Sequence, residues 1–251
     1  MKNIFFSILI LIATISFAQS QNIVHHRINT VINPKTATIS VTDSISFVGE
    51  AQNEFLLFAG LTPKSLSKGI KLLKTEENTI AKDVGMDRDD ADTKSQLLLN
   101  KWKIKGKAES LIISYEGIID GKMTASEENY QRGFAETTGV ISETGVYLAG
   151  SSYWVATFEN TLSTYQLTTS LPQSWRTVSQ GKRLSENATQ NTHTDTWLCE
   201  SPQEEIFLIA AEFTEYTHKM NSGINAMAFL RTPDEGLANK YLEVTEQYME
   251  M

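Results

Sequence analysis

The feature that most restricts the fold is a strict two-residue alternation in the segment 37–47. One parity is apolar, except for Asp43: Ala37, Ile39, Val41, Ile45 and Phe47. The other parity is filled with Ser and Thr, which is typical of a strand with one buried face and one wet face. Pro34 precedes this strand and favours a turn, because its ring presets φ for the second turn position. Residues 24–47 are therefore predicted to form a β-hairpin.

Further short apolar segments follow, separated by turn residues at intervals of about ten residues. They are residues 54–58, 96–104, 110–117, 145–148, 161–171, 177–179, 195–199, 205–211 and 224–230. Such spacing favours an all-β fold made of several sheets, sandwich-like, over alternating strands and helices.

Two polar stretches, residues 71–95 and 119–139, are predicted to be loops. The first contains the acidic run 87–92, for which a calcium loop is the alternative to a solvated surface. A calcium loop of the EF-hand type needs Gly at its sixth position and Glu at its twelfth. Asp92 and Leu98 occupy those positions, so the surface loop is favoured.

The last twenty residues change to a helical period. Thr232 and Glu235 have the spacing of a capping box, with a proline at the first helical position. Apolar residues then recur at helical spacing: Leu237, Tyr241, Val244 and Tyr248. No Gly, Asn or Pro closes this helix before Met251. We therefore expect residues 232–251 to be a single C-terminal helix that leads toward a second domain outside this sequence.

The N-terminus has the pattern of a secretory signal peptide. Lys2 is followed by the apolar stretch 4–15 and by small residues around Ala18. The apolar stretch is shorter than a typical membrane span, which disfavours an uncleaved anchor. We expect cleavage after residue 18 and export to the periplasm, the cell surface or the extracellular space.

The charge balance excludes some partners. The formal net charge is −8, and the pI is near 5.1. An acidic chain is a poor match for nucleic acid or for an anionic membrane surface, so we expect neither as a partner, and no membrane span after signal cleavage. Cys199 is the only cysteine, so no disulfide can form within the chain, and a buried structural thiol is expected.

No residue pattern of a metal site or a nucleophile is present in the sequence. The four histidines are His25, His26, His193 and His218, and none belongs to a His-Glu-x-x-His motif. Neighbouring residues on a strand point to opposite faces, so His25 and His26 cannot share a metal. His193 is expected in a polar loop. Ser152 lacks the second glycine of a nucleophile elbow, and a tight turn is expected there.

Residues 145–181 are the aromatic centre of the chain. The candidate aromatic residues are Tyr147, Tyr153, Trp154, Phe158 and Trp175. Aromatic side chains bury the largest area per residue, so core packing is favoured over a ligand cleft. A carbohydrate-binding face is the open alternative.

The same stretch resembles the N-terminal β "saddle" domain of the M1 family of zinc aminopeptidases. The motifs that carry the resemblance are Gly145-Val146-Tyr147-Leu148, Ser152-Tyr153-Trp154, Leu171-Pro172, Ser179-Gln180-Gly181, Trp197, Ser201-Pro202 and residues 206–213 and 226–233. The early hairpin, residues 26–47, resembles the first two strands of that domain. The resemblance implies a saddle domain over residues 19–231, followed by the first helix of a catalytic domain.

In that family the zinc ligands lie in the catalytic domain, so the resemblance implies no cofactor in this chain and zinc only in a full-length relative. It also implies that an N-terminal-domain residue holds the substrate's amino terminus, and Glu143 is the candidate by position. An exposed loop glutamate without a ligand is the alternative. No catalytic and no metal-binding residue is expected in this chain.

Two functions follow from these observations. The first is the noncatalytic N-terminal domain of an exported M1-like metallopeptidase, with a separate catalytic domain or chain as its partner and peptides as substrates only in that context. The second is a stand-alone secreted β-domain that binds a partner without enzymatic activity. For the isolated chain we expect no peptidase activity.

Overall fold

The computed structural model describes residues 22–80, 97–106, 110–121 and 139–251. The described residues form several β-sheets and a single C-terminal α-helix, which confirms the predicted all-β, multi-sheet fold class. The expected signal peptide, the acidic run 87–92 and most of the expected loop 119–139 lie outside the described residues. Among the described residues, no helix is long and apolar enough to cross a bilayer.

The large sheet has seven strands, and the predicted hairpin lies at its centre. Its order is β12 (Lys182–Ala188), β13 (Thr192–Gln203), β10 (Leu162–Pro172), β1 (Ile23–Asn33), β2 (Thr38–Val48), β7 (Ser110–Ile118) and β4 (Leu61–Ser65). Strands β1 and β10 run parallel, and the other neighbours are antiparallel. The alternation that predicts β2 is matched by its burial, with Ile39, Val41, Asp43 and Ile45 facing the core.

Three smaller sheets complete the fold. The inner sheet has the order β11 (Arg176–Val178), β14 (Leu208–Ala211), β9 (Gly145–Leu148) and β8 (Val140–Ser142). The side sheet has the order β3 (Glu54–Phe58), β6 (Leu98–Lys105) and β5 (Lys71–Ile80). The third sheet pairs β15 (Thr214–Lys219) with β16 (Asn225–Leu230).

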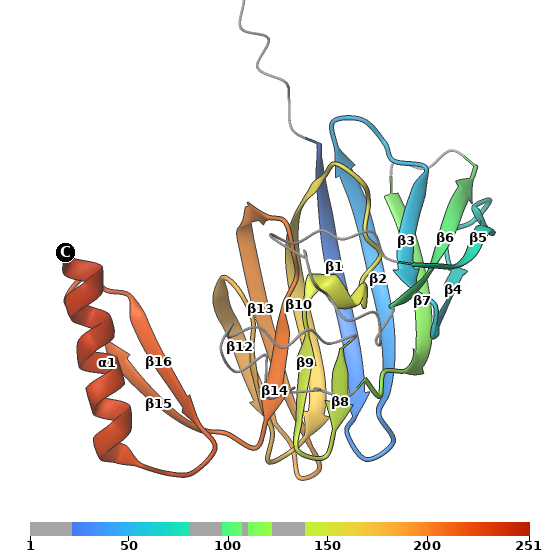
Figure 1. Ribbon diagram of the computed structural model, residues 1–251. Helices are drawn as coiled ribbons and strands as arrows, with labels where there is room; N and C mark the ends of the chain where they lie inside the picture. Colours follow the sequence, from blue (N-terminus) through green and yellow to red (C-terminus); the bar gives the residue numbers. More distant parts are fainter. Residues whose placement is uncertain (1–21, 81–96, 107–109, 122–138) are drawn as a thin grey trace, which may run out of the picture.

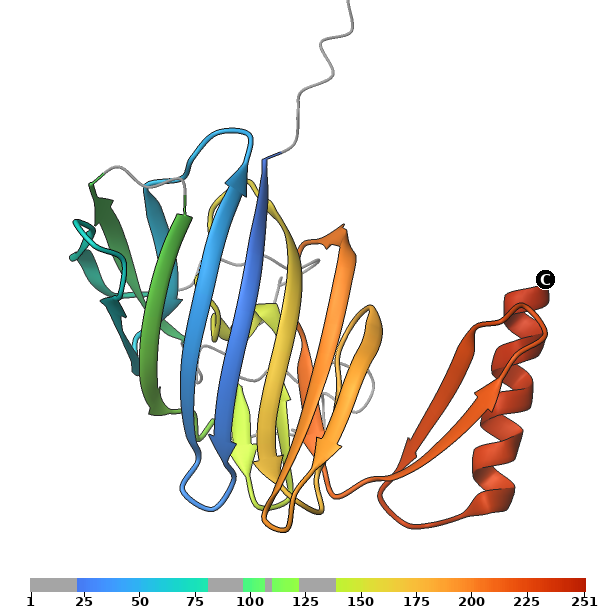
Figure 2. The ribbon, with the colours of Figure 1, turned by 180° about the vertical axis from the view of Figure 1, so that it is seen from behind.

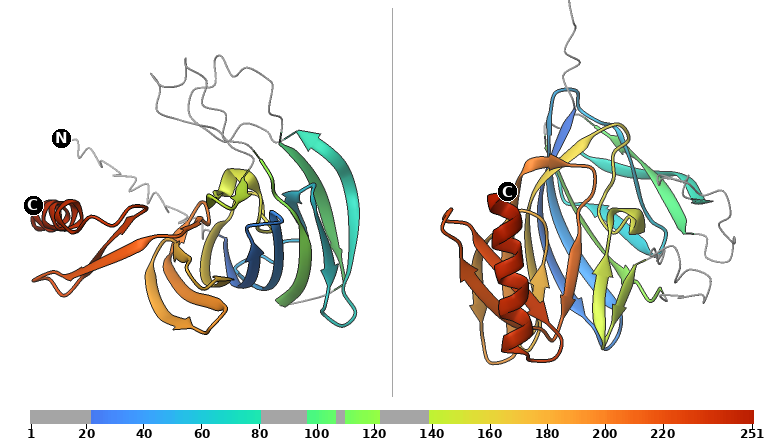
Figure 3. Two further views of the ribbon diagram at one scale, coloured as in Figure 1. Left: turned by 90° about the horizontal axis from the view of Figure 1, so that it is seen from below. Right: turned by 60° about the vertical axis from the view of Figure 1, so that its left-hand side comes forward.

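The large sheet curves, and the inner sheet lies in its hollow (Figure 3). The opposite face of the large sheet is not covered by any other element of the described residues (Figure 2). Most of the buried apolar side chains form one core between the curved sheet, the inner sheet and the side sheet. The side sheet lies at one end of the molecule and the C-terminal helix at the other (Figure 1).

The helix α1 (Glu235–Glu250) packs on β15 and β16, and we call these three elements the terminal unit. The unit has a small core of its own, formed by Met220, Ala226, Ala228, Ala238 and Leu242. The predicted N-cap Thr232 is wrong, because Asp234 is the cap and its carboxylate accepts the Leu237 N–H at 2.9 Å. The Tyr216 hydroxyl, 3.0 Å from the Asp234 N–H, accepts that hydrogen bond and holds the cap in place.

The prediction that residues 71–95 form a loop is partly wrong as well, since Lys71–Ile80 is the strand β5. This strand is irregular and highly charged, with pairing shifts at Glu76, and Asn78 adopts a φ of 50°. Its strand conformation comes from pairing with β6, which a local polar pattern does not reveal.

Candidate functional site

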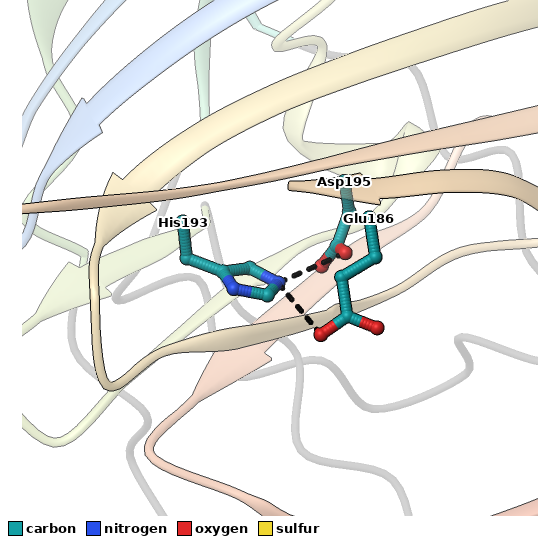
Figure 4. Close-up of side chains that lie close together, drawn as sticks. All are labelled: Glu186, His193 and Asp195. Carbon is teal, nitrogen blue, oxygen red and sulfur yellow. Dashed lines mark hydrogen bonds and ion pairs between the residues drawn. The ribbon is translucent and has the colours of Figure 1, made fainter. Parts of the chain in front are cut away.

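In the described part of the chain, one group of side chains has the spacing of a metal site. Glu186, His193 and Asp195 each offer one ligand atom, and these atoms lie within 4.8 Å of one another. Figure 4 shows the three side chains converging from β12 and β13. We call them the edge cluster, because β12 is the edge strand of the large sheet.

The strand geometry accounts for this convergence. His193 and Asp195 are two residues apart on β13, so both point to the buried face of the sheet. Glu186 lies opposite Asp195 in the register of β12 and β13. Both β13 side chains are buried, whereas the Glu186 side chain is 39% exposed.

The Asp195 carboxylate is saturated by donors from the protein. The Thr177 backbone N–H and hydroxyl donate to one oxygen at 3.1 and 2.7 Å. The His193 Nε2 lies 3.0 Å from the other oxygen. Trp197 Nε1 donates to the Thr177 hydroxyl at 2.9 Å, which aligns that hydroxyl toward Asp195. These three partners satisfy the buried carboxylate oxygens without a metal.

The edge cluster does not fit a divalent cation. A metal-bound histidine normally donates its other ring N–H to a neighbour, but the buried Nδ1 of His193 has no hydrogen-bond partner among the described residues. Two guanidinium groups also approach Glu186, because Arg176 Nε and Arg183 Nη2 each lie 3.6 Å from its carboxylate. They already supply the positive charge that a cation would bring.

Arg183, one of these two arginines, also connects the large sheet to the terminal unit. Arg183 donates from both Nη atoms to the Glu215 carboxylate, one of them at 2.6 Å. The two side chains are only 13% and 14% exposed. Burial opposes ionisation of Glu215, but the hydrogen bonds and charge of Arg183 outweigh it and lower the pKa of this carboxyl. The edge cluster is therefore a structural junction of β11, β12, β13 and β15.

The motifs that carry the family resemblance form a hydrogen-bonded centre. Trp154 Nε1 donates to the Ile206 carbonyl at 3.0 Å. The Gln180 amide oxygen accepts from the Tyr165 hydroxyl at 2.6 Å and from the Phe207 N–H at 2.9 Å. Burial raises the pKa of Tyr165 to about 12, so its hydroxyl keeps the proton that it donates. We call Trp154, Tyr165 and Gln180 the hub.

The aromatic residues of this stretch pack into the core, as predicted. Tyr153, Trp154, Phe158 and Trp175 are buried, and only Tyr147 is half-buried. They line no ligand cleft among the described residues. Ser152 lies in the predicted tight turn, where it donates to the Ala149 carbonyl at 2.6 Å.

Three histidines and the cysteine can be compared with their predicted positions. His26 is buried and 2.7 Å from Asp43, whereas His25 faces the other side, as predicted. The predicted loop position of His193 is wrong, because β13 begins at Thr192. Cys199 is buried as predicted, and burial raises the pKa of its thiol.

Glu143 lies at the exposed tip of the turn between β8 and β9. Its side chain makes no hydrogen bond or ion pair with a described residue. The neighbouring Thr144 carbonyl accepts from Arg231, which lies between β16 and α1. Glu143 is thus next to a residue that contacts the β16–α1 connection of the terminal unit, and its substrate-binding role stays a prediction.

The helix α1 exposes the apolar stripe that the sequence predicts. Tyr241 and Tyr248 are 53% and 72% exposed, and Leu237 and Val244 of the same stripe are exposed as well. The buried side of the helix is formed instead by Ala238 and Leu242.

Neither the protein-family models nor the curated protein sequences match this chain. Among solved structures, it is similar to an M1 zinc metallopeptidase from Deinococcus radiodurans, with a TM-score of 0.49 and 12% identity over 90% of this chain and 53% of that one. It is also similar to an aminopeptidase A from Legionella pneumophila, crystallised with aspartic acid, with a TM-score of 0.46 and 12% identity over 82% of this chain and 23% of that one. The chain spans about half the length of the first of these proteins.

Proposed function

We propose that this chain is the noncatalytic β domain of an exported M1-like metallopeptidase. It would support the zinc-dependent removal of N-terminal residues from peptides by a catalytic module that is a separate domain or chain. The observation that carries the proposal is the hub, because Trp154 and Gln180 belong to the motifs of the family resemblance. Gln180 links Tyr165 on β10 of the large sheet to Phe207, the residue before β14 of the inner sheet. The His-Glu-x-x-His motif of that family is not present in the sequence.

The terminal unit supports the proposal with a docking surface. The apolar stripe of α1 is unpartnered among the described residues, while the opposite side of the helix is packed. The β8–β9 turn next to this unit presents Glu143. A catalytic module that covers the stripe would bring its substrate near this carboxylate, which can bind the ammonium group of a peptide N-terminus.

A peptidase assay tests the proposal directly. The purified, zinc-loaded chain alone should release no chromophore from aminoacyl anilides, and release would refute the noncatalytic role. Mixed with an M1-type catalytic module, the chain should raise the rate of release. The variant Tyr241→Ser/Tyr248→Ser should lose this gain, whereas Val48→Ser/Leu184→Ser, which alters exposed apolar residues elsewhere, should keep it.

The second candidate is a stand-alone binding module, and the separate small core of the terminal unit favours it. Because this core already packs α1, the chain can be stable without a catalytic module. Size-exclusion chromatography separates the two functions. A stand-alone module should elute as one species whether or not the stripe is changed. A docking domain should self-associate through the exposed stripe, and this self-association should disappear in Tyr241→Ser/Tyr248→Ser.

A further inference from the structure

The side sheet, at the end of the molecule opposite to α1 (Figure 1), and the segment before it are rich in lysine. The described residues 54–80 and 97–106 contain seven lysines: Lys64, Lys68, Lys71, Lys74, Lys101, Lys103 and Lys105. They contain three acidic residues: Glu54, Glu76 and Glu77. The balance is seven minus three, or +4, in a chain whose net charge is −8. These two segments are therefore basic, although the whole chain is acidic, and Glu159 from another segment offsets part of the charge near Lys101.

Part of this charge is neutralised within the side sheet. Lys101 and Lys103 lie 3.3 and 3.1 Å from the Glu54 carboxylate. Lys68, Lys71 and Lys105 are exposed and form no hydrogen bond or ion pair with a described residue. These three ammonium groups are therefore available to a ligand, and Lys103, which shares Glu54 with Lys101, is partly exposed beside them.

The fold places these lysines side by side. Lys71 on β5 is directly opposite Lys105 on β6. Directly opposed residues in an antiparallel pair have Cα atoms about 4.5–5.5 Å apart. Lys103 follows two residues along β6, on the same face. A Cβ at Gly106 would lie 2.7 Å from the Gly69 carbonyl, so the loop that carries Lys68 is in close contact with the end of β6.

The fold itself does not explain this arrangement. Like charges directly opposite each other destabilise a strand pair. Lysines on an edge strand protect against aggregation, which accounts for Lys71 on the edge strand β5. The ion pair with Glu54, directly opposite on β3, accounts for Lys103. Neither reason accounts for Lys105, because β6 is the central strand of the side sheet.

We propose that Lys68, Lys71, Lys103 and Lys105 form a binding surface for a linear carboxylated or sulfated polysaccharide. The lysine ammonium is a flexible point charge, which suits a polyanion without fixed bidentate geometry. Single-stranded nucleic acids need exposed aromatic side chains for base stacking. Of the aromatic residues in the side sheet, Phe55 and Trp102 are buried in the core, and Phe58 is partly buried and packs against it.

An anionic membrane is a poorer match for the same surface. A bilayer presents a broad negative plane to the whole molecule, so it repels a chain with a net charge of −8. A flexible polymer can contact the lysines alone. Its binding depends on the release of counterions and therefore falls steeply with salt.

Salt-dependent binding of the purified full chain to heparin and to polygalacturonate tests this proposal. Four lysines should give a slope of about −3 in a plot of log K against log salt, at roughly 0.7 per charge. The variant Lys71→Gln/Lys105→Gln should weaken the slope by about 1.4 units. The control Lys182→Gln/Lys240→Gln removes the same charge from exposed lysines elsewhere and should leave the slope unchanged.

The thermal midpoint of each variant serves as the folding control, and it should not fall in Lys71→Gln/Lys105→Gln because a like-charge pair is removed. Loss of binding with an intact midpoint supports the proposal. No binding of the natural chain at about 50 mM salt, or equal losses in both variants, would overturn it. Stronger binding to phosphatidylglycerol vesicles or to a single-stranded oligonucleotide than to either polysaccharide would overturn the assigned ligand.

Discussion

The replacement Asp195→Ala tests whether the edge cluster is a structural junction. It removes the acceptor of three hydrogen bonds, two from Thr177 and one from His193. Thr177 and His193 are both buried, so water cannot replace the lost carboxylate without a rearrangement of the core. In the variant, the Thr177 hydroxyl would still accept the hydrogen bond from Trp197 Nε1, which holds its orientation. Its own proton would then have no acceptor, because the Asp195 carboxylate is gone.

The size of the effect follows from the donors left behind. Each buried donor without a partner costs about 1–3 kcal/mol. The Thr177 N–H, the Thr177 hydroxyl and the His193 Nε2 interact with one carboxylate, so their contributions do not add fully. We expect the free energy of unfolding to fall by about 3–5 kcal/mol. For a chain of this size, this corresponds to a decrease in Tm of about 6–20 °C.

Urea unfolding followed by tryptophan fluorescence measures this loss. The matched control is Glu200→Ala, on the same strand, because Glu200 is 72% exposed in an ion pair with Lys182. The control should lose less than about 1 kcal/mol. The conservative variant Asp195→Asn should lie between the two, since its amide oxygen can still accept from Thr177. A loss for Asp195→Ala no larger than that of the control would refute the assigned role.

Three further outcomes are expected. The pKa of Glu215 is lowered in the folded state, so the pairing of Glu215 with Arg183 stabilises the fold at pH values above the unfolded pKa near 4.5. This stabilisation is lost as the pH falls through the folded pKa. In a plot of Tm against pH, Glu215→Gln should therefore show a smaller decrease of Tm in acid than the natural chain does. Gln180→Leu removes the acceptor of the Phe207 N–H and the shortest hydrogen bond of the Tyr165 hydroxyl, which keeps Ser179 and the backbone carbonyl of residue 180 as partners. It should lower the free energy of unfolding in urea by about 1–3 kcal/mol, whereas an unchanged midpoint would contradict the hub. Cys199, buried and with its pKa raised, should react with a thiol reagent at neutral pH only after denaturation; rapid reaction of the native chain would show that this thiol is accessible.

The parts of the fold with a regular local pattern were predictable. The alternation around Val41 predicts β2, and the helical period of Leu237, Tyr241 and Val244 predicts α1. The start of α1 was not predictable in detail, because Thr232 and Asp234 both have capping side chains. The Tyr216 hydroxyl, which comes from another strand, favours Asp234.

The edge cluster was missed, although a signal for it was present. Cys199 and Trp197 share one parity, and extending that parity backward reaches Asp195 and His193. The polar character of these two residues concealed the buried face of β13. A buried aspartate is stable only with donors, and its donor Thr177 lies 18 positions earlier in the chain. Local sequence does not contain that pairing.

The sequence by itself determined the class of the fold, since strand and helix periods are local properties of neighbouring side chains. It also shows that the chain has no His-Glu-x-x-His motif. The tertiary structure decided where charge is concentrated and which polar groups are buried. Lys71 and Lys105 become neighbours only through strand pairing, and Arg183 meets Glu215 only where the terminal unit joins the large sheet. Such contacts depend on the path of the backbone in space, which no short stretch of sequence specifies.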